Sequence, residues 1–458
     1  MSFETDTLAA IATPPGLGGL CVIRISGPEA FAIGDRLVGG SVEKPSKRPA
    51  NTFFYASVLH PRTHEKIDDA IFLIFRAPHS FTGEDTLEIQ GHGGRLPPAR
   101  ILEAVLAAGA KLAPPGGFSQ RAFLNGRLDL TQAEAICDFI HAKSERAAKL
   151  ARAQLDGDLG QEINTVYDQL LATSADVEHI LDFDEDEVPD TFIPEIIDRI
   201  SSTCRTLSRL IESWHEGQII REGALIVLSG KPNAGKSSLM NTLLRRNRAI
   251  VNDQPGTTRD VIEEAFSLEG ISLRLMDTAG LRETGNAVEQ EGITRAREWM
   301  ARADVNIHLI DRSDPEALTP PPSLPDPGRT LIILSKSDLP NALPVPLPLP
   351  KETAAVISLS TRTGEGIETL KESMLELLGL DAGGGVPPPA VSLRHAEELR
   401  VALDQGTRAQ KALNRGAEGL VLAAIHLKNS CEAVGRITGR VYTEELLDRI
   451  FSTFCVGK

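Results

Sequence analysis

The sequence predicts a multidomain protein with an α+β domain at its N-terminus, a discontinuous helical domain, and an α/β domain inserted into the helical one. Three observations support this prediction. Short β-prone runs separated by Pro- and Gly-containing turns fill residues 1–127. Stretches rich in Ala, Leu and Glu follow at 128–222 and again at 381–458. Between them, residues 223–380 alternate strand-like and helix-like segments, which is typical of a parallel sheet.

The composition is that of a globular protein with several cores. The chain has 458 residues, of which 41% are hydrophobic and 24% charged, and this length suits about two to four domains. No apolar run approaches the roughly 18 residues of a membrane span. The five cysteines lack CxxC spacing and predict neither a zinc site nor a disulfide framework, so we expect a cytoplasmic location. A net charge of −15 indicates that any RNA contact is local or shared with a partner.

In the N-terminal segment, the β-prone runs and their turns define the expected elements. Turn signals occur at 14–16, 91–94 and 114–117. Strands are expected at 20–25, 70–75 and 86–89, and an amphipathic helix at 100–112.

The helical segments begin at Leu128, where Thr131–Glu134 has the sequence of a capping box. An acidic run at 182–187 is read as a solvated turn, with a divalent metal site as the less favoured alternative. The Gly- and Pro-rich stretch 381–389 is read as a linker. Helices are expected at 131–181, 193–222, 393–413, 417–437 and 443–454. Since neither helical half looks complete alone, we predict one helical domain built from both flanks of the inserted domain.

The inserted domain opens with a strand, a glycine-rich turn and a helix around Gly230–Ser237. The glycines let backbone N–H groups turn toward one point, and the helix adds the positive end of its dipole, so the turn suits a phosphate chain. Lys236 is expected to reach the β- and γ-phosphates, and the Ser237 hydroxyl to bind Mg²⁺. Further strands are expected at 271–276, 305–310, 330–334 and 354–359, after the first at 224–228, and helices at 236–246, 287–301 and 366–378.

Two motifs downstream match the switch segments of a GTPase. Asp277–Gly280 follows a predicted strand, where a carboxylate can hold Mg²⁺ through water and the Gly280 N–H can sense the γ-phosphate. Gly256–Asp260 lies in a Gly- and Pro-containing loop whose threonines can complete the Mg²⁺ shell.

The base-reading motif is Ser335–Asp338. Asp338 can accept hydrogen bonds from guanine N1–H and the 2-amino group, which adenine lacks, so the motif favours GTP over ATP. Ser335 stands where Asn is usual, and its loss of an amide contact is expected to weaken guanine binding by about 1 kcal/mol. Residues 358–362 follow the next strand, where a loop can pack on the base. One motif can arise by chance, whereas four in this order indicate a Ras-like P-loop G domain.

The residue after Asp-Thr-Ala-Gly is Leu281, where small Ras-like enzymes carry a water-positioning Gln. Because leucine cannot orient water, hydrolysis needs another residue, a partner arginine or a cation. Glu289 is a candidate, and a solvated glutamate at a helix start is the alternative for the same residue.

With a G domain lying between two helical halves, the sequence resembles the MnmE (TrmE) family of tRNA-modification GTPases over essentially its full length. The motifs that carry the resemblance, besides those of the G domain, are Thr13–Gly16, Arg24–Gly27, Thr82–Asp85, Gln90–Gly94, Arg121–Asn125 and the terminal Cys455–Lys458.

The resemblance implies a homodimer, joined through folate-binding-like N-terminal domains, that works with the FAD-containing partner MnmG (GidA) as a heterotetramer. The pair would add an aminomethyl or carboxymethylaminomethyl group at C5 of the wobble uridine of certain tRNAs. A 5,10-methylene- or 5-formyl-tetrahydrofolate would supply the one-carbon unit. By the same resemblance, the folate site maps to Arg24, Glu88 and Arg127 with Lys458 from the helical domain, and Cys455 is a functional thiol. From the residues alone, Cys455 also reads as a small side chain near a chain end.

The resemblance further implies GTP hydrolysis that K⁺ stimulates, with the cation in the place of an arginine finger. Glu289 maps to the water-activating glutamate, with Asp277 and Lys236 as the other catalytic residues. Mg²⁺ would be bound by Ser237 and Thr258. K⁺ would be bound by Asn233, Asn252, the Gln254 carbonyl and Thr257. The full set expected to bind nucleotide and its cations is Asn233, Ala234, Gly235, Lys236, Ser237, Ser238, Asn252, Gly256, Thr257, Thr258, Asp277, Thr278, Ala279, Gly280, Ser335, Lys336, Asp338, Ser360, Thr361 and Arg362.

A second hypothesis is a GTP-dependent binding switch, such as a ribosome-assembly GTPase without modification chemistry. Such a switch needs neither the Gly91–Gly94 motif nor the terminal Cys455–Lys458 motif, and would be expected to carry a basic RNA-binding domain. We therefore favour a GTP hydrolase acting in tRNA modification.

Overall fold

The computed structural model describes residues 6–181, 191–246, 263–277, 297–314, 326–339, 353–380 and 390–458, and the chain divides into two compact units. The first unit comprises Met1–Cys137, Gln154–Ile200 and Gln405–Lys458, and the second Asp138–Ala153 and Ser201–Asp404. Within the described ranges, none of the helices is both long and apolar enough to cross a lipid bilayer.

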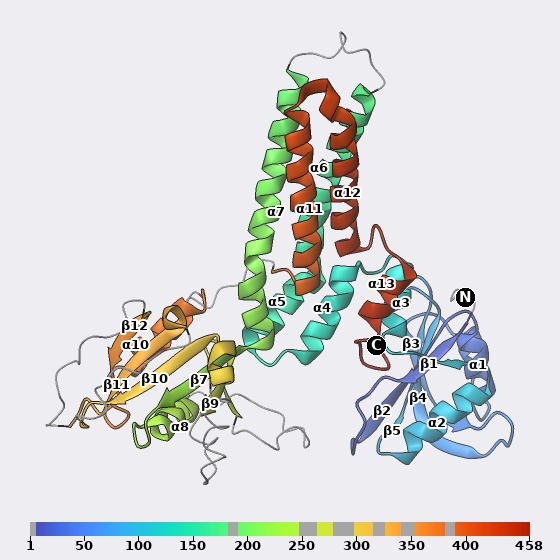
Figure 1. Cartoon of the computed structure of the whole chain (residues 1–458). Helices are drawn as coiled ribbons and strands as arrows, with labels where there is room; N and C mark the ends of the chain where they lie inside the picture. Colours follow the sequence, from blue (N-terminus) through green and yellow to red (C-terminus); the bar gives the residue numbers. More distant parts are fainter. Residues whose placement is uncertain are drawn as a thin grey trace. The chain divides into compact units, whose positions relative to one another are not determined.

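A six-stranded sheet forms the N-terminal part of the first unit, in the order β3-β4-β5-β2-β1-β6 (Figure 1). Its strands pair antiparallel, except that β1 and β6 are parallel. Three of these strands were not predicted from the sequence: β1, β3 and β6, the last lying where the end of a helix was expected. The strands are β1 (Leu8–Ile11), β2 (Leu20–Ser26), β3 (Thr52–Leu59), β4 (Lys66–Phe75), β5 (Thr86–His92) and β6 (Lys111–Leu112).

One face of this sheet is covered, and the other is open at β3 but covered at β1, where Leu8 and Ala10 are buried with Phe118. On the covered face, Ile23, Ile89 and Phe72 are fully buried with side chains from α1 (Ala30–Leu37) and α2 (Leu96–Ala107). On the open face, Phe53 and Tyr55 of β3 are 73% and 66% exposed. The alternation of side chains along each strand thus gives the sheet one core face and one face that is accessible at β3.

The helix predicted at 100–112 is wrong at both ends. The observed α2 begins at Leu96, because prolines fit the first turn, where backbone N–H groups have no helical partner. It ends at Ala107, before Gly109 with a φ of 116°. Residues 111–112 then form β6 beside β1.

The helical stretch predicted at 131–181 is divided into three helices. These are α4 (Leu130–His141), α5 (Glu145–Asp156) and α6 (Asp158–Ile180), and Gly157, with a φ of 100°, separates the last two. The capping box is also displaced from Thr131–Glu134. Asp129 Oδ1 accepts the Gln132 N–H at 2.8 Å and Gln132 Oε1 accepts the Asp129 N–H at 3.0 Å, so Asp129 caps the helix.

The last two helices of the first unit lie where they were expected, at 417–437 and 443–454, whereas the helices at 30–37 and 117–124 were not predicted. The helix α12 (Leu420–Thr438) runs beside α6 (Figure 1). A side chain at Gly435 would lie 2.9 Å from the Tyr167 ring, so glycine allows this close packing. The other helices of this unit are α3 (Gly117–Leu124) and α13 (Glu444–Phe451), with the 3₁₀ turns η2 (Pro45–Lys47) and η7 (Gly416–Gly419).

The second unit holds a six-stranded sheet in the order β12-β11-β10-β7-β9-β8, parallel except for β8 (Figure 1). The five strands predicted from the sequence are found, and β8 was missed. The strands are β7 (Ala224–Gly230), β8 (Glu263–Leu268), β9 (Ile271–Asp277), β10 (Val305–Asp311), β11 (Thr330–Ser335) and β12 (Ala355–Ser358).

The core of this sheet includes Leu239 of α8 (Lys236–Arg246) and Leu370 of α10 (Ile367–Leu377). The helices α7 (Phe192–Glu222) and α11 (Leu393–Leu413) lead into and out of the G domain, and η6 (Pro327–Arg329) precedes β11. Of the helix predicted at 287–301, residues 297–302 are helical and the earlier ones lie outside the described residues, as does the acidic run 182–187.

Candidate functional site

The phosphate-binding loop joins β7 to α8. Three of its residues have left-handed backbone conformations: Gly230 with a φ of 134°, Asn233 with 61° and Gly235 with 98°. A side chain at Gly230 would lie 2.4 Å from the Leu309 carbonyl oxygen of β10, so only glycine fits there. Such a turn directs successive N–H groups into one concavity at the start of α8, which suits an anion.

The ammonium group of Lys236 lies at this concavity. Its Nζ donates hydrogen bonds to the carbonyl oxygens of Gly230 at 3.0 Å and Lys231 at 2.9 Å, and the residue is 5% exposed. A lysine held against its own loop places a positive charge at the site expected for the phosphates.

Ser237 and Asp277 meet beside the loop. The Ser237 hydroxyl donates to Asp277 Oδ2 at 3.4 Å, and Asp277, the last residue of β9, is 8% exposed. Their oxygens are hard ligands of the kind that Mg²⁺ prefers. The residues present therefore fit a Mg²⁺ ion bound with the phosphates.

The base-reading residues converge at the ends of β11 and β12. Ser360 Oγ donates to Asp338 Oδ1 at 2.7 Å and accepts the backbone N–H groups of Arg362 and Thr363 at 3.2 Å each. Arg362 Nη1 is 3.9 Å from Asp338 Oδ2. These contacts hold the Asp338 carboxylate in one orientation, as recognition of a guanine edge requires.

Lys336, the second residue of that motif, pairs with Asp311 at the end of β10. The two atoms Lys336 Nζ and Asp311 Oδ2 are 2.5 Å apart. Burial favours the neutral acid, but hydrogen bonds from Lys336 and Ser313 outweigh it and hold the pKa of Asp311 below its ordinary value. The pair fixes the Lys336 side chain beside the base-reading loop.

Ser335 links this loop to the phosphate-binding loop. Its buried hydroxyl donates to the Ala234 carbonyl oxygen at 2.7 Å, with the Ile310 carbonyl at 3.2 Å. The serine lacks the usual amide, but its hydroxyl makes a structural contact between the two loops that was not predicted from the sequence.

A buried histidine lies behind the phosphate-binding loop and was not singled out from the sequence. His308 of β10 lies opposite Ser229 of β7, and the Ser229 Oγ and His308 Nδ1 atoms are 2.9 Å apart. Burial, and to a smaller extent the charge of Lys236, lowers the pKa of His308 from 6.5 to about 4.

This pKa shift predicts acid sensitivity of the G domain. In the unfolded chain His308 takes up a proton below about pH 6.5, whereas in the folded chain it does so only near pH 4. Protonation of the unfolded chain therefore lowers the folding stability as the pH falls from 6.5 toward 4, and the full stability is present above 6.5. We expect the unfolding free energy to fall by about 2 kcal/mol between about pH 7 and about pH 5 from this group. Urea unfolding of the variant His308→Phe should lack this fall in unfolding free energy between the two pH values. His215→Gln, at an exposed position, should keep it, and equal slopes for all three proteins would contradict the prediction.

A second cluster of predicted residues lies on the open face of the N-terminal sheet. Arg24 of β2 is directly opposite Glu88 of β5, and Arg24 Nε and Nη2 lie 2.9 and 2.8 Å from Glu88 Oε1. The guanidinium lies 5.3 Å from the Phe81 ring centre and 5.5 Å from that of Phe118. Among the described residues, its buried Nη1 finds no hydrogen-bond acceptor. A cation with an unused donor between two aromatic rings fits a ligand that has an aromatic ring and acceptor atoms, such as a folate.

The C-terminal residues reach the same cluster. The Phe118 N–H donates to the Lys458 carbonyl at 3.3 Å, and a side chain at Gly457 would lie 2.5 Å from the Ile11 carbonyl oxygen, so the tail packs closely against β1. Burial and the charge of Arg24 lower the pKa of Lys458, against smaller opposing effects of Glu88 and Cys455. The structure therefore places the Lys458 backbone against Phe118, whose ring flanks the Arg24 guanidinium.

The other two residues expected at this site are placed differently. Cys455 is exposed, and its carbonyl accepts the N–H groups of Gly116 and Lys458. Arg127 is exposed and lies beside Gly83, where a side chain would be 3.2 Å from Arg127 Cγ.

Several expected residues of the nucleotide site lie outside the described residues. They are Asn252, Gln254, Gly256, Thr257, Thr258, Thr278, Ala279, Gly280 and Glu289.

Sequence reasoning missed the buried network behind the Arg24 cluster. Glu84 accepts hydrogen bonds from Ser26 Oγ at 2.8 Å and from Arg121 Nη1 at 2.7 Å. Both Glu84 and Arg121 lie in motifs that carried the family resemblance. The position of both charged residues inside these motifs was the available signal.

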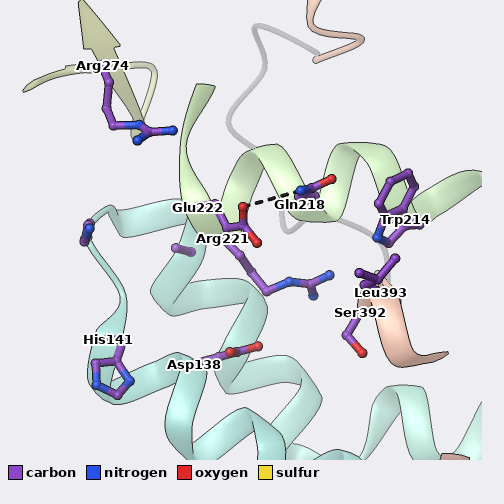
Figure 2. A pocket seen from close by; sticks show the side chains of 11 residues that line it. Asp138, His141, Trp214, Gln218, Arg221, Glu222, Arg274, Ser392 and Leu393 are labelled. Carbon is purple, nitrogen blue, oxygen red and sulfur yellow. Dashed lines mark hydrogen bonds between the residues drawn. The ribbon is translucent and has the colours of Figure 1, made fainter. Parts of the chain in front are cut away.

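A polar cavity of about 520 Å³ lies elsewhere in the second unit (Figure 2). The Arg221 side chain points into it and donates to the Ala390 carbonyl at 3.2 Å. None of the phosphate-binding or base-reading residues lines it. The lining residues are Asp138, His141, Lys143, Ala147, Trp214, Gln218, Arg221, Glu222, Arg274, Ser392 and Leu393.

Two family models match most of the chain. Residues 130–455 match the MnmE helical domain, and residues 7–127 match a family described as the GTP-binding protein TrmE N-terminus. Two relatives are each named tRNA modification GTPase MnmE. The one from Geobacter metallireducens is 40% identical and covers 99% of both chains, and the one from Geobacter sulfurreducens is 41% identical and covers 100% of both. The solved G domain of the T. maritima FeoB iron transporter is similar over 34% of this chain and 98% of its own, with 26% identity and a TM-score of 0.24.

The fold and its phosphate-binding and base-reading loops define a multidomain P-loop GTPase, with a G domain inserted between helical segments that follow an α+β domain. The extent and identity of the matches then settle the family. The chain belongs to the MnmE family of tRNA modification GTPases.

Proposed function

We propose that this chain is a K⁺-stimulated GTP hydrolase that, with an FAD-containing partner of the MnmG kind, forms the C5 aminomethyl or carboxymethylaminomethyl group on the wobble uridine of certain tRNAs. The observation that carries the proposal is the packing of the C-terminal Lys458 backbone on Phe118, whose ring lies 5.5 Å from the Arg24 guanidinium of the Arg24–Glu88 pair. A binding switch has no use for a second, folate-compatible site in the same chain as its G domain, so this observation favours an enzyme of modification.

In the proposed hydrolysis, Lys236 binds the β- and γ-phosphates, and Ser237 and Asp277 hold Mg²⁺, which supplies neutralisation of the developing charge. Thr258 would complete the Mg²⁺ shell. Asp338, oriented by Ser360, selects guanine. Glu289 orients the attacking water, since Leu281 cannot.

K⁺ would supply positive charge near the phosphates, in the place that an arginine finger takes in other GTPases. Asn233 in the phosphate-binding loop, with Asn252, Gln254 and Thr257, is proposed to hold it. The left-handed backbone of Asn233 fits a position in the loop's tight turn.

At the N-terminal site, Arg24, Glu88 and Lys458 would hold a tetrahydrofolate, with Arg127 and the Cys455 thiol nearby. When bound, the folate supplies a one-carbon unit. We further propose that the chain acts as a homodimer joined through its N-terminal domains, in a heterotetramer with the partner, on tRNA in the cytoplasm.

The cation dependence of GTP turnover tests the nucleotide part of the proposal. We expect the rate in K⁺ to exceed the rate in Na⁺ by about tenfold or more at equal ionic strength, because the cation contributes electrostatic stabilisation of the transition state. The measurement is phosphate release over a range of each chloride salt, with choline chloride as the control for ionic strength. Equal rates in K⁺ and Na⁺ would rule out the cation mechanism.

Nucleoside analysis of tRNA tests the modification part. In cells that lack this chain, the wobble uridines should lose the C5 group, and the wild-type gene should restore it. If deletion leaves the amount of C5-modified wobble uridine unchanged, the result would instead favour the GTP-dependent binding switch.

A further inference from the structure

The Gly91–Gly94 motif at the end of β5 presents one exposed imidazole that has a fixed orientation. His92 Nδ1 lies 2.7 Å from Asp68 Oδ1, and the His92 backbone N–H donates to Asp68 Oδ2 at 2.8 Å. The Asp68 side chain is 10% exposed, whereas that of His92 is 70% exposed. The ring is therefore held at one nitrogen while its Nε2 edge faces outward.

The glycines of the motif are explained by this arrangement. A side chain at Gly91 would lie 2.7 Å from Asp68 Oδ2, and one at Gly93 would lie 2.1 Å from the Gly18 carbonyl oxygen. Gly94 has a φ of 89°. Larger residues would thus displace the carboxylate or the neighbouring Gly18 loop, so the motif is shaped around the Asp68–His92 contact.

The contact also selects the tautomer of His92. Burial favours the neutral form of Asp68, but hydrogen bonds from the His92 backbone, the His92 ring and the Asp69 N–H outweigh it and lower the Asp68 pKa. An ionised carboxylate only accepts hydrogen bonds, so Nδ1 carries the proton and Nε2 is left with a lone pair. This carboxylate–imidazole pairing is the one that orients histidine bases in enzymes.

His92 ends the strand that carries Glu88 of the Arg24 cluster. Leu20 is directly opposite His92 in the register in which Arg24 is opposite Glu88. The alternation along β5 puts the Cβ atoms of Glu88 and His92 on the same side and about 13 Å apart, a separation that an elongated ligand can bridge, while the His92 ring turns to Asp68 at the sheet edge. The side chains of Leu17, Leu20 and Leu96 are 95%, 70% and 68% exposed and provide apolar contact area in the segments next to His92.

We propose that His92 is a general acid–base residue of the reaction at the N-terminal domain; this rests on the proposed function. His92 Nε2 takes the proton that the attacking amine nitrogen loses as its bond to the one-carbon unit forms. The same proton is then given to the carrier nitrogen whose bond to that carbon breaks. The cycle leaves His92 unchanged and involves no net oxidation. Asp68 is a positioning residue that stabilises the imidazolium in between.

Chemical rescue separates this role from a structural one. With the full chain, its FAD-containing partner, tRNA, GTP, 5,10-methylene-tetrahydrofolate and an amine (ammonium or glycine), His92→Ala should form modified uridine about 100-fold more slowly or worse, and added imidazole should restore part of the rate. GTP hydrolysis and folate affinity should stay at wild-type values. The matched control His79→Ala, at another exposed histidine of this domain, should modify tRNA normally. Undiminished modification by His92→Ala, or a loss that imidazole does not relieve, would overturn the proposal.

Chemical labelling provides a readout that is independent of turnover. Diethylpyrocarbonate should label His92 in the free protein, and 5-formyl-tetrahydrofolate should protect it while leaving His79 labelled. Labelling of His92 that the folate does not change would place the imidazole away from the reacting atoms and contradict the proposal. If the wild-type protein forms no modified nucleoside while still binding folate, the proposed function itself fails.

Discussion

Replacing Asp277 with asparagine should lower the kcat of GTP hydrolysis by about 100-fold or more, and should remove the stimulation by K⁺. The carboxylate ends β9 next to the phosphate-binding loop, and Ser237 Oγ lies 3.4 Å from it. Asparagine keeps the volume and the hydrogen bond but loses the negative charge that holds Mg²⁺ in place. Since a bound metal contributes several kcal/mol of charge stabilisation to a transition state, its displacement costs at least this factor in rate.

The same substitution should leave the G domain as stable as before, or more so. Asp277 is 8% exposed, and removing a largely buried charge does not weaken folding through desolvation. Single-turnover GTP hydrolysis at saturating Mg²⁺, together with urea unfolding, measures both quantities. The matched control is Asp326→Asn, whose carboxylate is 49% exposed and lies 3.7 Å from Arg329. A rate within a few fold of wild type for Asp277→Asn would contradict the assigned role.

The G domain could be predicted from the sequence because its signals are local. Each parallel strand is a short apolar run, and the glycines of the phosphate-binding loop stand next to the strand that they end. The expected strands at 224–228, 271–276 and 305–310 are found extended by one or two residues. The strand β8 was missed because it is an antiparallel edge strand whose sequence Glu263–Leu268 starts with two acids.

The N-terminal cluster could not have been assembled from the residues without the family resemblance. Arg24 and Glu88 are 64 positions apart and meet only through the register of β2 and β5. Phe81 and Phe118 flank the guanidinium from a loop and from α3. Such contacts depend on strand pairing between distant segments, and periodicity within one segment does not reveal them. The Asp68–His92 pair was missed for the same reason.

Replacing Arg24 with methionine should weaken binding of 5-formyl-tetrahydrofolate by about 30-fold or more. The Arg24 and Glu88 side chains are each 15% exposed, so the variant leaves a carboxylate with little solvent and no cation. It also removes the Nη1 donor, which finds no acceptor among the described residues and is therefore available to a ligand. Losing a hydrogen bond from a charged donor to the ligand costs about 2 kcal/mol, which gives about this factor in Kd.

A double variant separates the loss of the ligand contact from a loss of folding. Arg24→Met alone should also lower the unfolding free energy, because Glu88 remains buried without its partner. In Arg24→Met/Glu88→Gln the stability should recover, since no charge is left unpaired, while folate binding measured by titration calorimetry should stay weak. The matched control is Arg100→Met, which breaks an exposed pair with Glu65 and should change neither quantity. Recovery of folate binding in the double variant would show that Arg24 acts only by keeping the sheet folded. Continued weak binding by the stable double variant would assign the loss to the missing Arg24–Glu88 contacts with the folate and not to unfolding.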